Sequence, residues 1–215
     1  MFVAKFDRKR SMRRRYSTEY PHFSRLPRQS CQAGFSLVEV MVVVGIISLG
    51  LAWGGYAMFR NLPDYRLRAA ARSIVSDMQD ARMQAVKRGQ DWAIVFNPGA
   101  SSYNVCRGRG PDDAWGTADD DVARTVNLSQ NFSGVIMGFG MANRAATAAG
   151  GAIGSSVTFQ NNRVVFDRRG RCNVAGFVYI QQSPPNTHLV YAVGARMTGT
   201  VLMYRWGVND WIGRE

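Results

Sequence analysis

The feature that most constrains this chain is an apolar segment that follows a long basic one. Residues 35–59 read FSLVEVMVVVGIISLGLAWGGYAMF, and their only formal charge is Glu39. A helix rises about 1.5 Å per residue, so a segment of this length is able to cross a hydrocarbon layer of roughly 30 Å. The sequence therefore predicts a transmembrane helix at residues 35–59.

The charge before the apolar segment predicts its orientation. Residues 1–34 hold nine Lys and Arg residues against two acidic ones, a net +7, which leaves +5 of the chain's +12 for residues 35–215. Cytoplasmic flanks of membrane helices are rich in Lys and Arg, so we expect the amino terminus inside the cell and the rest of the chain outside. A charge so unevenly placed does not indicate a uniformly basic nucleic-acid-binding domain.

The order of the segments argues against an ordinary secretory signal. Such a signal places its cleavage site after the apolar run, whereas here the small and polar residues 30–34 precede it. Cleavage between Gly34 and Phe35 would free an amino group four residues before Glu39. That amine, on this or a neighbouring copy, is a natural partner for a carboxylate whose place in an apolar span costs on the order of 3 kcal/mol. The alternative is a carboxylate that reaches the membrane surface or stays protonated.

Residues 34–39, Gly-Phe-Ser-Leu-Val-Glu, resemble the type IV prepilin signature, Gly-Phe-(Ser/Thr)-Leu-x-Glu, followed by its hydrophobic run. The resemblance implies that a membrane-embedded aspartic peptidase cuts after Gly34 and methylates the amine of Phe35. It also implies that Glu39 guides docking of the subunit into a helical filament. Residues 1–34 then form a leader that is removed. This leader is longer than usual, and Met12 is a second candidate start; an uncleaved membrane anchor is the alternative.

Beyond residue 60 the pattern becomes that of an amphipathic helix. Gly89 is a typical stop, so residues 60–89 are expected to continue the membrane helix and to pack on a globular head. Pro63 should break or kink the helix near the junction. Apolar residues recur at alternating spacings of four and three, which puts them on one helical face: Leu67, Ala71, Ile74, Met78, Ala81 and Ala85.

Residues 90–215 lose the helical period and predict a β-rich head. Residues 141–154 are small and polar and are expected to form a loop. The pattern predicts an α+β fold in which a long amino-terminal helix packs on an antiparallel head. Short runs of β-branched and aromatic residues alternate with turn residues, at residues 92–96, 103–106, 123–128, 135–139, 156–159, 163–166, 177–181, 189–195 and 200–206.

Three short motifs narrow the family: residues 82–88 (RMQAVKR) before a strand, 165–170 (VFDRRG), and 198–201 (TGTV) before an aromatic strand. They resemble the group that joins FimT-like minor pilins with the H subunit, GspH, of type II secretion pseudopili. The resemblance implies two small antiparallel sheets under the helix. It also implies an inner-membrane subunit with a periplasmic head that becomes part of a pseudopilus or a surface pilus. Its partners would be other pilins, the prepilin peptidase and the inner-membrane assembly platform.

Removal of the leader would leave two cysteines, Cys106 and Cys172. In an oxidising compartment these residues are candidates for one disulfide. Spacing alone does not show that they lie close together, so two unrelated buried thiols are the alternative.

A glycine-rich acidic segment, residues 108–121, is a candidate metal site. The Asp-x-Asp-x-Asp-Gly pattern of an EF-hand loop is absent, and a solvated acidic hairpin loop is the preferred alternative. No other cofactor is expected. Five carboxylates fall within ten residues, a density that suits Ca²⁺ with its six to eight oxygen ligands: Asp112, Asp113, Asp119, Asp120 and Asp121.

Four arginines, Arg163, Arg168, Arg169 and Arg171, are a candidate phosphate-binding site. Such a cluster grips phosphates without reading base sequence. FimT-like pilins that bind DNA in natural transformation carry arginine-rich segments near the carboxyl end, whereas here the cluster lies inside the head. A solvated turn is the preferred alternative, and a DNA-binding minor pilin is the second functional hypothesis.

No catalytic set emerges from the sequence. Only two histidines are present, His22 and His188, which supports neither a zinc site nor a Ser-His-Asp triad. We expect a structural and assembly subunit, not an enzyme. The patterns do not separate a pilus from a secretion pseudopilus.

Overall fold

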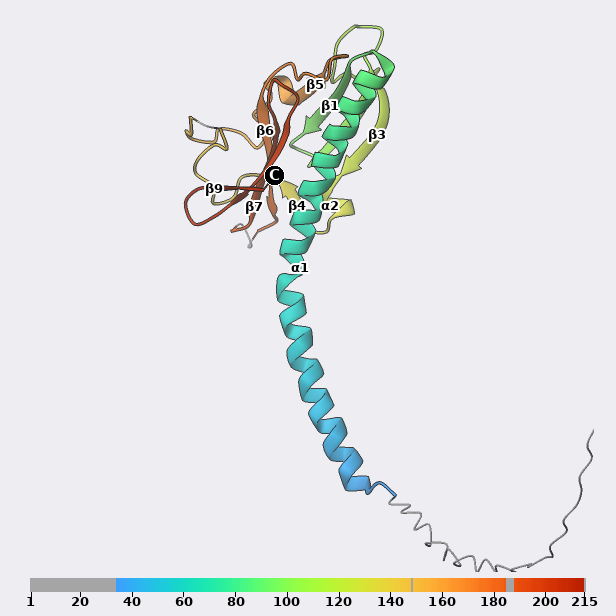
Figure 1. Cartoon of the computed structure of the whole chain (residues 1–215), viewed down its shortest axis with the longest axis vertical. Helices are drawn as coiled ribbons and strands as arrows, with labels where there is room; N and C mark the ends of the chain where they lie inside the picture. Colours follow the sequence, from blue (N-terminus) through green and yellow to red (C-terminus); the bar gives the residue numbers. More distant parts are fainter. Residues whose placement is uncertain (1–33, 148, 185–187, 215) are drawn as a thin grey trace, which may run out of the picture. The chain divides into compact units, whose positions relative to one another are not determined.

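The computed structural model describes residues 34–147, 149–184 and 188–214. The chain separates into two compact units, Met1–Ile47 and Ser48–Glu215. Helix α1, Leu37–Arg88, begins in the first unit and ends in the second (Figure 1). The predicted leader lies outside the described residues, with the exception of Gly34.

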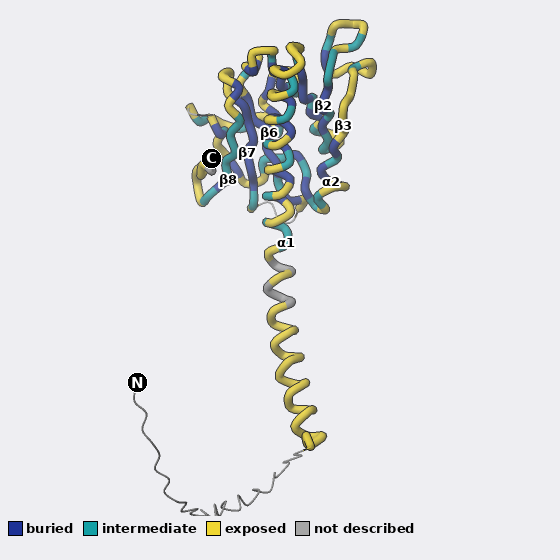
Figure 2. Tube along the Cα trace, turned by 45° about the vertical axis from the view of Figure 1, so that its right-hand side comes forward, coloured by how far each residue is buried: buried dark blue, intermediate teal, exposed yellow. Residues whose placement is uncertain are grey.

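The first section of α1 is apolar and exposed. Residues Leu37–Gly54 have a mean hydropathy of 2.2, and none of them is buried (Figure 2). Within the described part of the chain, this is the one stretch of helix that is long and apolar enough to cross a membrane. Apolar side chains that the described part of the chain leaves uncovered are stable in lipid or against other subunits.

Pro63 lies inside α1 but does not end it, so the predicted break does not occur. A proline lacks the N–H that would bond to the carbonyl one turn earlier, which weakens a helix at that point. Here the head supports the helix, because the side-chain amide of Gln182 donates a hydrogen bond of 2.6 Å to the Pro63 carbonyl. Gln182 is buried, and the bond ties the helix to the head at its weak point.

The second section of α1 packs on the head along the predicted apolar stripe. All six predicted residues are 0% exposed, and Ala70 joins them. The amphipathic helix is thus confirmed, and its many alanines let the backbone approach the sheets closely. The helix stops at Gly89, whose φ of +66° lies in the left-handed region that glycine adopts without strain.

The first sheet contains four antiparallel strands in the order β3-β2-β1-β5. Their bounds are Trp92–Asn97 for β1, Ser102–Gly108 for β2, Asp121–Asn127 for β3 and Arg163–Phe166 for β5. A short helix α2, Leu128–Asn131, follows β3. In the register, Ala93 of β1 lies opposite Cys106 of β2 on one side and opposite Val165 of β5 on the other.

The second sheet contains five antiparallel strands in the order β4-β6-β7-β8-β9. Their bounds are Val135–Met137 for β4, Gly176–Gln182 for β6, Val190–Ala195 for β7, Val201–Trp206 for β8 and Trp211–Arg214 for β9. Strand β6 ends at Gln182, beside Pro63. Because neighbouring strands alternate in direction, the turn between β8 and β9 lies at that same end of the sheet.

One core joins α1 to both sheets. It includes Tyr103 and Phe166 of the first sheet and Ile180 and Tyr191 of the second, all 0% exposed. Figure 2 shows these buried strands on both sides of the helix. The arrangement confirms the predicted α+β fold of a long helix on two small antiparallel sheets.

Two parts of the strand prediction are wrong. Within the described residues, 156–159 form no strand and keep one bridge, between Val157 and Val178. The backbone N–H of Thr158 still bonds to the Phe177 carbonyl, but the Phe177 N–H bonds to the Thr158 hydroxyl in place of a backbone carbonyl, so the ladder does not continue. Strand β9 is missing from the prediction, because its four residues include a glycine and show no alternating pattern.

Candidate functional site

The predicted processing site is exposed and precedes the helix. Gly34 and Phe35 lie before the first residue of α1, and the Phe35 side chain is 82% exposed. A peptide bond in exposed chain outside a helix is accessible to a peptidase, whereas a bond inside a helix has its backbone groups engaged. The Gly34–Phe35 bond therefore has the accessibility that cleavage requires.

Glu39 lies in the first turn of α1 and is exposed. The first N–H groups of a helix favour a carboxylate at this position, because the positive end of the helix dipole is there. In the described chain, no ion pair joins Glu39 to a basic side chain. Its carboxylate is consequently open to a positive group on another molecule.

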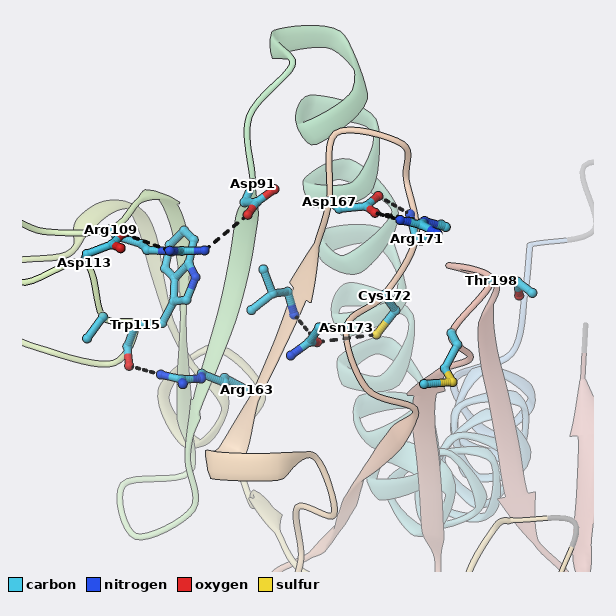
Figure 3. A pocket seen from close by; sticks show the side chains of 13 residues that line it. Asp91, Arg109, Asp113, Trp115, Arg163, Asp167, Arg171, Cys172, Asn173 and Thr198 are labelled. Atoms are coloured by element: carbon cyan, nitrogen blue, oxygen red, sulfur yellow. Dashed lines mark hydrogen bonds and ion pairs between the residues drawn. The ribbon is translucent and has the colours of Figure 1, made fainter.

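In the head, a cleft of about 860 Å³ opens beside the first strand after α1 (Figure 3). Charged side chains form its walls, and apolar side chains of β5 and of two turns form part of its floor. It is lined by Asp91, Arg109, Asp113, Ala114, Trp115, Arg163, Val165, Asp167, Arg171, Cys172, Asn173, Met197 and Thr198.

Arg109 forms one wall of the cleft. Its guanidinium binds the carboxylate of Asp113 at 2.8 Å and that of Asp91 at 3.3 Å. It also lies over the ring of Trp115, 5.7 Å from the ring centroid, a geometry in which a cation is attracted to the face of the ring. Figure 3 shows these groups converging from the acidic segment and from the start of β1.

Trp115 was not identified from the sequence, yet it holds the acidic segment on the first sheet. Its side chain is 7% exposed and packs with Ala93, Cys106 and Val165 on the face of the sheet that is turned away from α1. The Arg163 guanidinium donates a hydrogen bond to the Trp115 carbonyl. The sequence signal that could have identified it is that Trp115 is the one aromatic residue in this acidic, glycine-rich segment. The segment is thus a cover anchored on the sheet by one buried residue, while most of its other residues are exposed.

The five aspartates of this segment do not gather into a calcium site. They bind separate partners: Asp112 the N–H of Ala114, Asp113 the guanidinium of Arg109, Asp120 the N–H of Gly116, and Asp121 the guanidinium of Arg107. The exposed Asp119 has a lowered pKa, chiefly because the Thr117 side chain donates a hydrogen bond to it. No group of three acidic, His or Cys side chains able to hold a metal ion occurs among the described residues. The arrangement therefore does not support the calcium prediction.

Cys106 and Cys172, the two candidates for a disulfide, are free and buried in the structure. Cys106 lies opposite Ala93, which in turn lies opposite Val165 on β5. Cys172 bridges to Phe166 from the far side of β5. Three strand spacings put the two Cα atoms roughly 14 Å apart, whereas a disulfide requires less than about 7 Å.

The four arginines proposed to bind phosphate do not act as one group. Arg163 is held by the Trp115 carbonyl, and Arg171 forms an ion pair of 2.9 Å with Asp167. Desolvation acts to raise the pKa of Asp167, but hydrogen bonds from the N–H and guanidinium of Arg171 outweigh it, and the pKa is lowered. Only Arg168 and Arg169, at the tip of this turn, are exposed and carry no acidic partner within the described chain.

The charged groups that line the cleft are already paired with one another or with a carbonyl. The three arginines and three aspartates of the cleft cancel in charge. The cleft also contains a thiol, Cys172, whose pKa burial raises, so it is not an activated nucleophile. A general acid or base has to be held free beside a substrate, and the described lining provides none.

Two family models match the sequence. The prokaryotic N-terminal methylation motif matches residues 29–54, and the type II transport protein GspH matches residues 70–199, more than half of the chain. Among solved structures, the type IV minor pilin FimU of Pseudomonas aeruginosa is 14% identical, with a TM-score of 0.41 and coverage of 64% of this chain and 87% of that chain. A structural similarity of that size carries no argument about function. No curated protein matches the chain significantly.

Proposed function

This chain belongs to the family of the type II transport protein GspH, and we propose that it works as a minor pilin or pseudopilin, a structural and assembly subunit of a helical filament. The observation that carries the proposal is the exposed apolar section of α1, Leu37–Gly54, which lies within the methylation motif at residues 29–54. Such a surface is stable in lipid before assembly and among neighbouring helices afterwards.

Processing is the first step of the proposed mechanism. A prepilin peptidase in the inner membrane cuts the exposed bond between Gly34 and Phe35 and methylates the new amine. The positive leader holds the amino terminus in the cytoplasm until then, so that the head lies in the periplasm.

Docking is the second step. The Glu39 carboxylate of an incoming subunit pairs with the amine of Phe35 on a neighbour, at the inner-membrane assembly platform. A pair of opposite charges in an apolar medium is stabilised only when the two groups meet closely. The pair therefore stabilises the one axial register of the helices in which the two groups meet, and other registers lack this stabilisation.

Mass spectrometry and filament isolation test this proposal together. We expect the mature chain to begin with a methylated Phe35 and to appear in the sheared filament fraction. Glu39→Gln should be processed normally but should be lost from that fraction. Asp80→Asn, which removes a carboxylate from the head-packed section of the same helix, is the matched control and should assemble. An intact amino terminus in the native host would overturn the proposal.

Within this class we favour a subunit of a type II secretion pseudopilus over a subunit of a type IV pilus, on the strength of the family description. Deletion of the gene distinguishes the two. Loss of protein export to the medium with normal surface pili is the expected result. Loss of pili with normal export would show the opposite assignment.

A DNA-binding minor pilin is the second candidate, because Arg168 and Arg169 are exposed and have basic neighbours. Arg82 donates a hydrogen bond of 2.8 Å to the carbonyl of Gly170, and the exposed Arg196 begins the adjacent turn. Positive side chains on one surface bind phosphates without base specificity.

Salt-dependent DNA binding by the processed full-length protein in detergent tests this second candidate. Arg168→Glu with Arg169→Glu should weaken the mobility shift and lower the salt slope by about two. Arg66→Glu with Arg72→Glu, two exposed positions on α1, gives the same change of charge and should leave the shift. An equal effect of both pairs would show a general charge effect and no site.

A further inference from the structure

A buried tyrosine and an arginine meet between α1 and the second sheet, close to the end of the head where Gln182 binds Pro63. Tyr191 of β7 is 0% exposed. Its hydroxyl lies near the Arg68 guanidinium of α1, but it makes no hydrogen bond of good geometry within the described chain. A buried polar group in this state is unfavourable unless another group bonds to it.

A second arginine, Arg205 of β8, reaches the same place. It lies opposite Tyr191 in the strand register. Val201 and Met203 of the same strand pack against the core under α1, and residues two apart on a strand point to the same face of the sheet. The Nε atoms of Arg205 and Arg68 are both buried and have no hydrogen-bond partner among the described residues. Two guanidiniums therefore lie beside one unsatisfied hydroxyl.

The site formed by Arg68, Tyr191 and Arg205 is positively charged. Asp64, one turn before Arg68, is the acidic residue that acts on that guanidinium. No ion pair joins Arg68 or Arg205 to a carboxylate in the part of the chain that the structure describes. Two positive charges thus face one negative charge. Guanidinium and phenol groups donate hydrogen bonds, and phosphate oxygens are the acceptors that arginine binds best.

The site is within reach of the membrane surface along α1. The apolar run ends at Phe59, and the nine residues from there to Arg68 rise about 13 Å. Helical side chains lean toward the amino-terminal end, which on α1 is the membrane end, so the long Arg68 side chain brings its charge closer to the lipid. The headgroup layer extends roughly 5–7 Å beyond the hydrocarbon. Tyr191 and Arg205 lie near the same end, because β7 begins there and β8 ends there.

We infer that Arg68, Arg205 and Tyr191 bind the phosphate of an anionic phospholipid in the membrane from which α1 emerges. The continuity of α1 identifies the occupant, since an apolar helix that crosses a bilayer places lipid headgroups directly below the site. Two arginines just outside the span are not explained by topology, because orientation depends on positive charge at the cytoplasmic flank.

Asp64 favours phosphatidylglycerol among the anionic lipids. Its Oδ1 atom is buried and has no hydrogen-bond partner within the described chain. A headgroup that carries hydroxyls beside its phosphate satisfies this acceptor and the arginines together. The inference goes beyond the proposed function and rests only on its membrane-anchored stage: the bound lipid holds the head on the membrane until the subunit is extracted.

Native mass spectrometry of the full-length protein in detergent, titrated with phosphatidylglycerol or phosphatidylcholine, tests the inference. We expect phosphatidylglycerol to bind at least about tenfold more tightly, because choline brings a positive charge against two arginines and a hydrogen bond to a charged group is worth about that factor. Arg68→Gln with Arg205→Gln should remove this preference. Arg66→Gln with Arg196→Gln, at two exposed positions outside the site, removes the same charge and should keep it.

Tyr191→Phe keeps the buried ring and supplies an independent readout, which stays decisive even where the double arginine variant fails to fold. It should weaken phosphatidylglycerol binding about fivefold, the value of one hydrogen bond. Equal binding of the two lipids by wild type, or an equal loss in both arginine pairs, would overturn the inference. Displacement of the lipid by an equal concentration of inorganic phosphate would also overturn it, because it would show a site for free phosphate.

Filament isolation separates this result from the proposed function. Wild-type protein that enters the filament fraction but shows no lipid preference would overturn the lipid site and leave the proposed function standing. Wild-type protein that prefers phosphatidylglycerol but stays out of the filament fraction would overturn the proposed function and leave the lipid site standing.

Discussion

The carboxylate of Asp77 accepts a hydrogen bond of 2.5 Å from the hydroxyl of Tyr103. Asp77 lies on α1 and Tyr103 on β2, and both side chains are buried. Arg124 on β3 forms an ion pair with the other oxygen of the same carboxylate. Burial, and then the hydrogen bond to Asp77, raise the pKa of Tyr103, so its hydroxyl remains a donor. One carboxylate thus ties the helix to two neighbouring strands.

Replacing Asp77 with Ala should lower the free energy of unfolding by about 3 kcal/mol, because the change leaves a buried hydroxyl without its acceptor and Arg124 without its partner. Tyr103→Phe should cost about 1 kcal/mol. Chemical denaturation followed by circular dichroism measures both. Asp80→Ala, one turn later on α1 and only half-buried, is the control. An equal loss for Asp77→Ala and Asp80→Ala would contradict the role given to Asp77.

The buried thiols should be unreactive in the folded protein. Burial, and then the nearby charge of Asp120, raise the pKa of Cys106 to about 12, and burial raises the pKa of Cys172. The thiolate is the reactive form, so both side chains should resist alkylation at neutral pH. Mass spectrometry of the processed protein should show no label when folded and two labels after unfolding without reductant. Two labels that appear only after reduction would mean a disulfide.

Trp115→Ala should open the cover over the outer face of the first sheet. The change removes a buried indole and should cost about 3 kcal/mol. Because Trp115 packs beside Cys106, it should also make that thiol accessible to alkylation in the folded protein, while Cys172 stays protected. Peptide mapping of the label distinguishes the two cysteines. Trp115→Phe is the control, and equal labelling of Cys106 and Cys172 in Trp115→Ala would indicate general unfolding instead.

The Asp167–Arg171 pair should make stability depend on acid pH. The pKa of Asp167 is lowered in the folded protein, so the pair stabilises the fold above the unfolded pKa of about 3.9 and loses this effect as the pH falls through the folded pKa. Wild type should therefore be more stable than Asp167→Asn at pH 6, and the difference should shrink as the pH falls below about 3.9. Denaturation at several pH values measures this. Asp112→Asn, which removes an exposed carboxylate, is the control.

Local patterns in the sequence predicted the helix and its buried face. The stripe from Leu67 to Ala85 follows the period of a helix, and that period is a property of consecutive residues. The same holds for most strands, whose β-branched and aromatic runs are short and contiguous. The processing motif at Gly34 and Phe35 could also be identified from the sequence, because it consists of a few adjacent residues.

Contacts between distant segments were not predictable in this way. Strand β5 pairs with β1 although about 70 residues separate them in the chain, and this pairing is what moves Cys172 away from Cys106. The sequence did not identify Trp115 as a buried residue, because five aspartates dominate the composition of its segment. Its burial depends on Ala93 and Val165, which nothing in the local sequence connects to it.

The Gln182–Pro63 hydrogen bond limits where the head can be separated from its anchor. A soluble fragment that started after Gly89 would keep every strand but would lack the helical face that closes the core. Its two sheets would expose aromatic side chains and would be prone to aggregate. A fragment that starts a few residues before Pro63 keeps this bond. Limited proteolysis of the assembled subunit should accordingly stop at the amino-terminal side of Pro63, which makes that residue the start of the smallest self-sufficient piece.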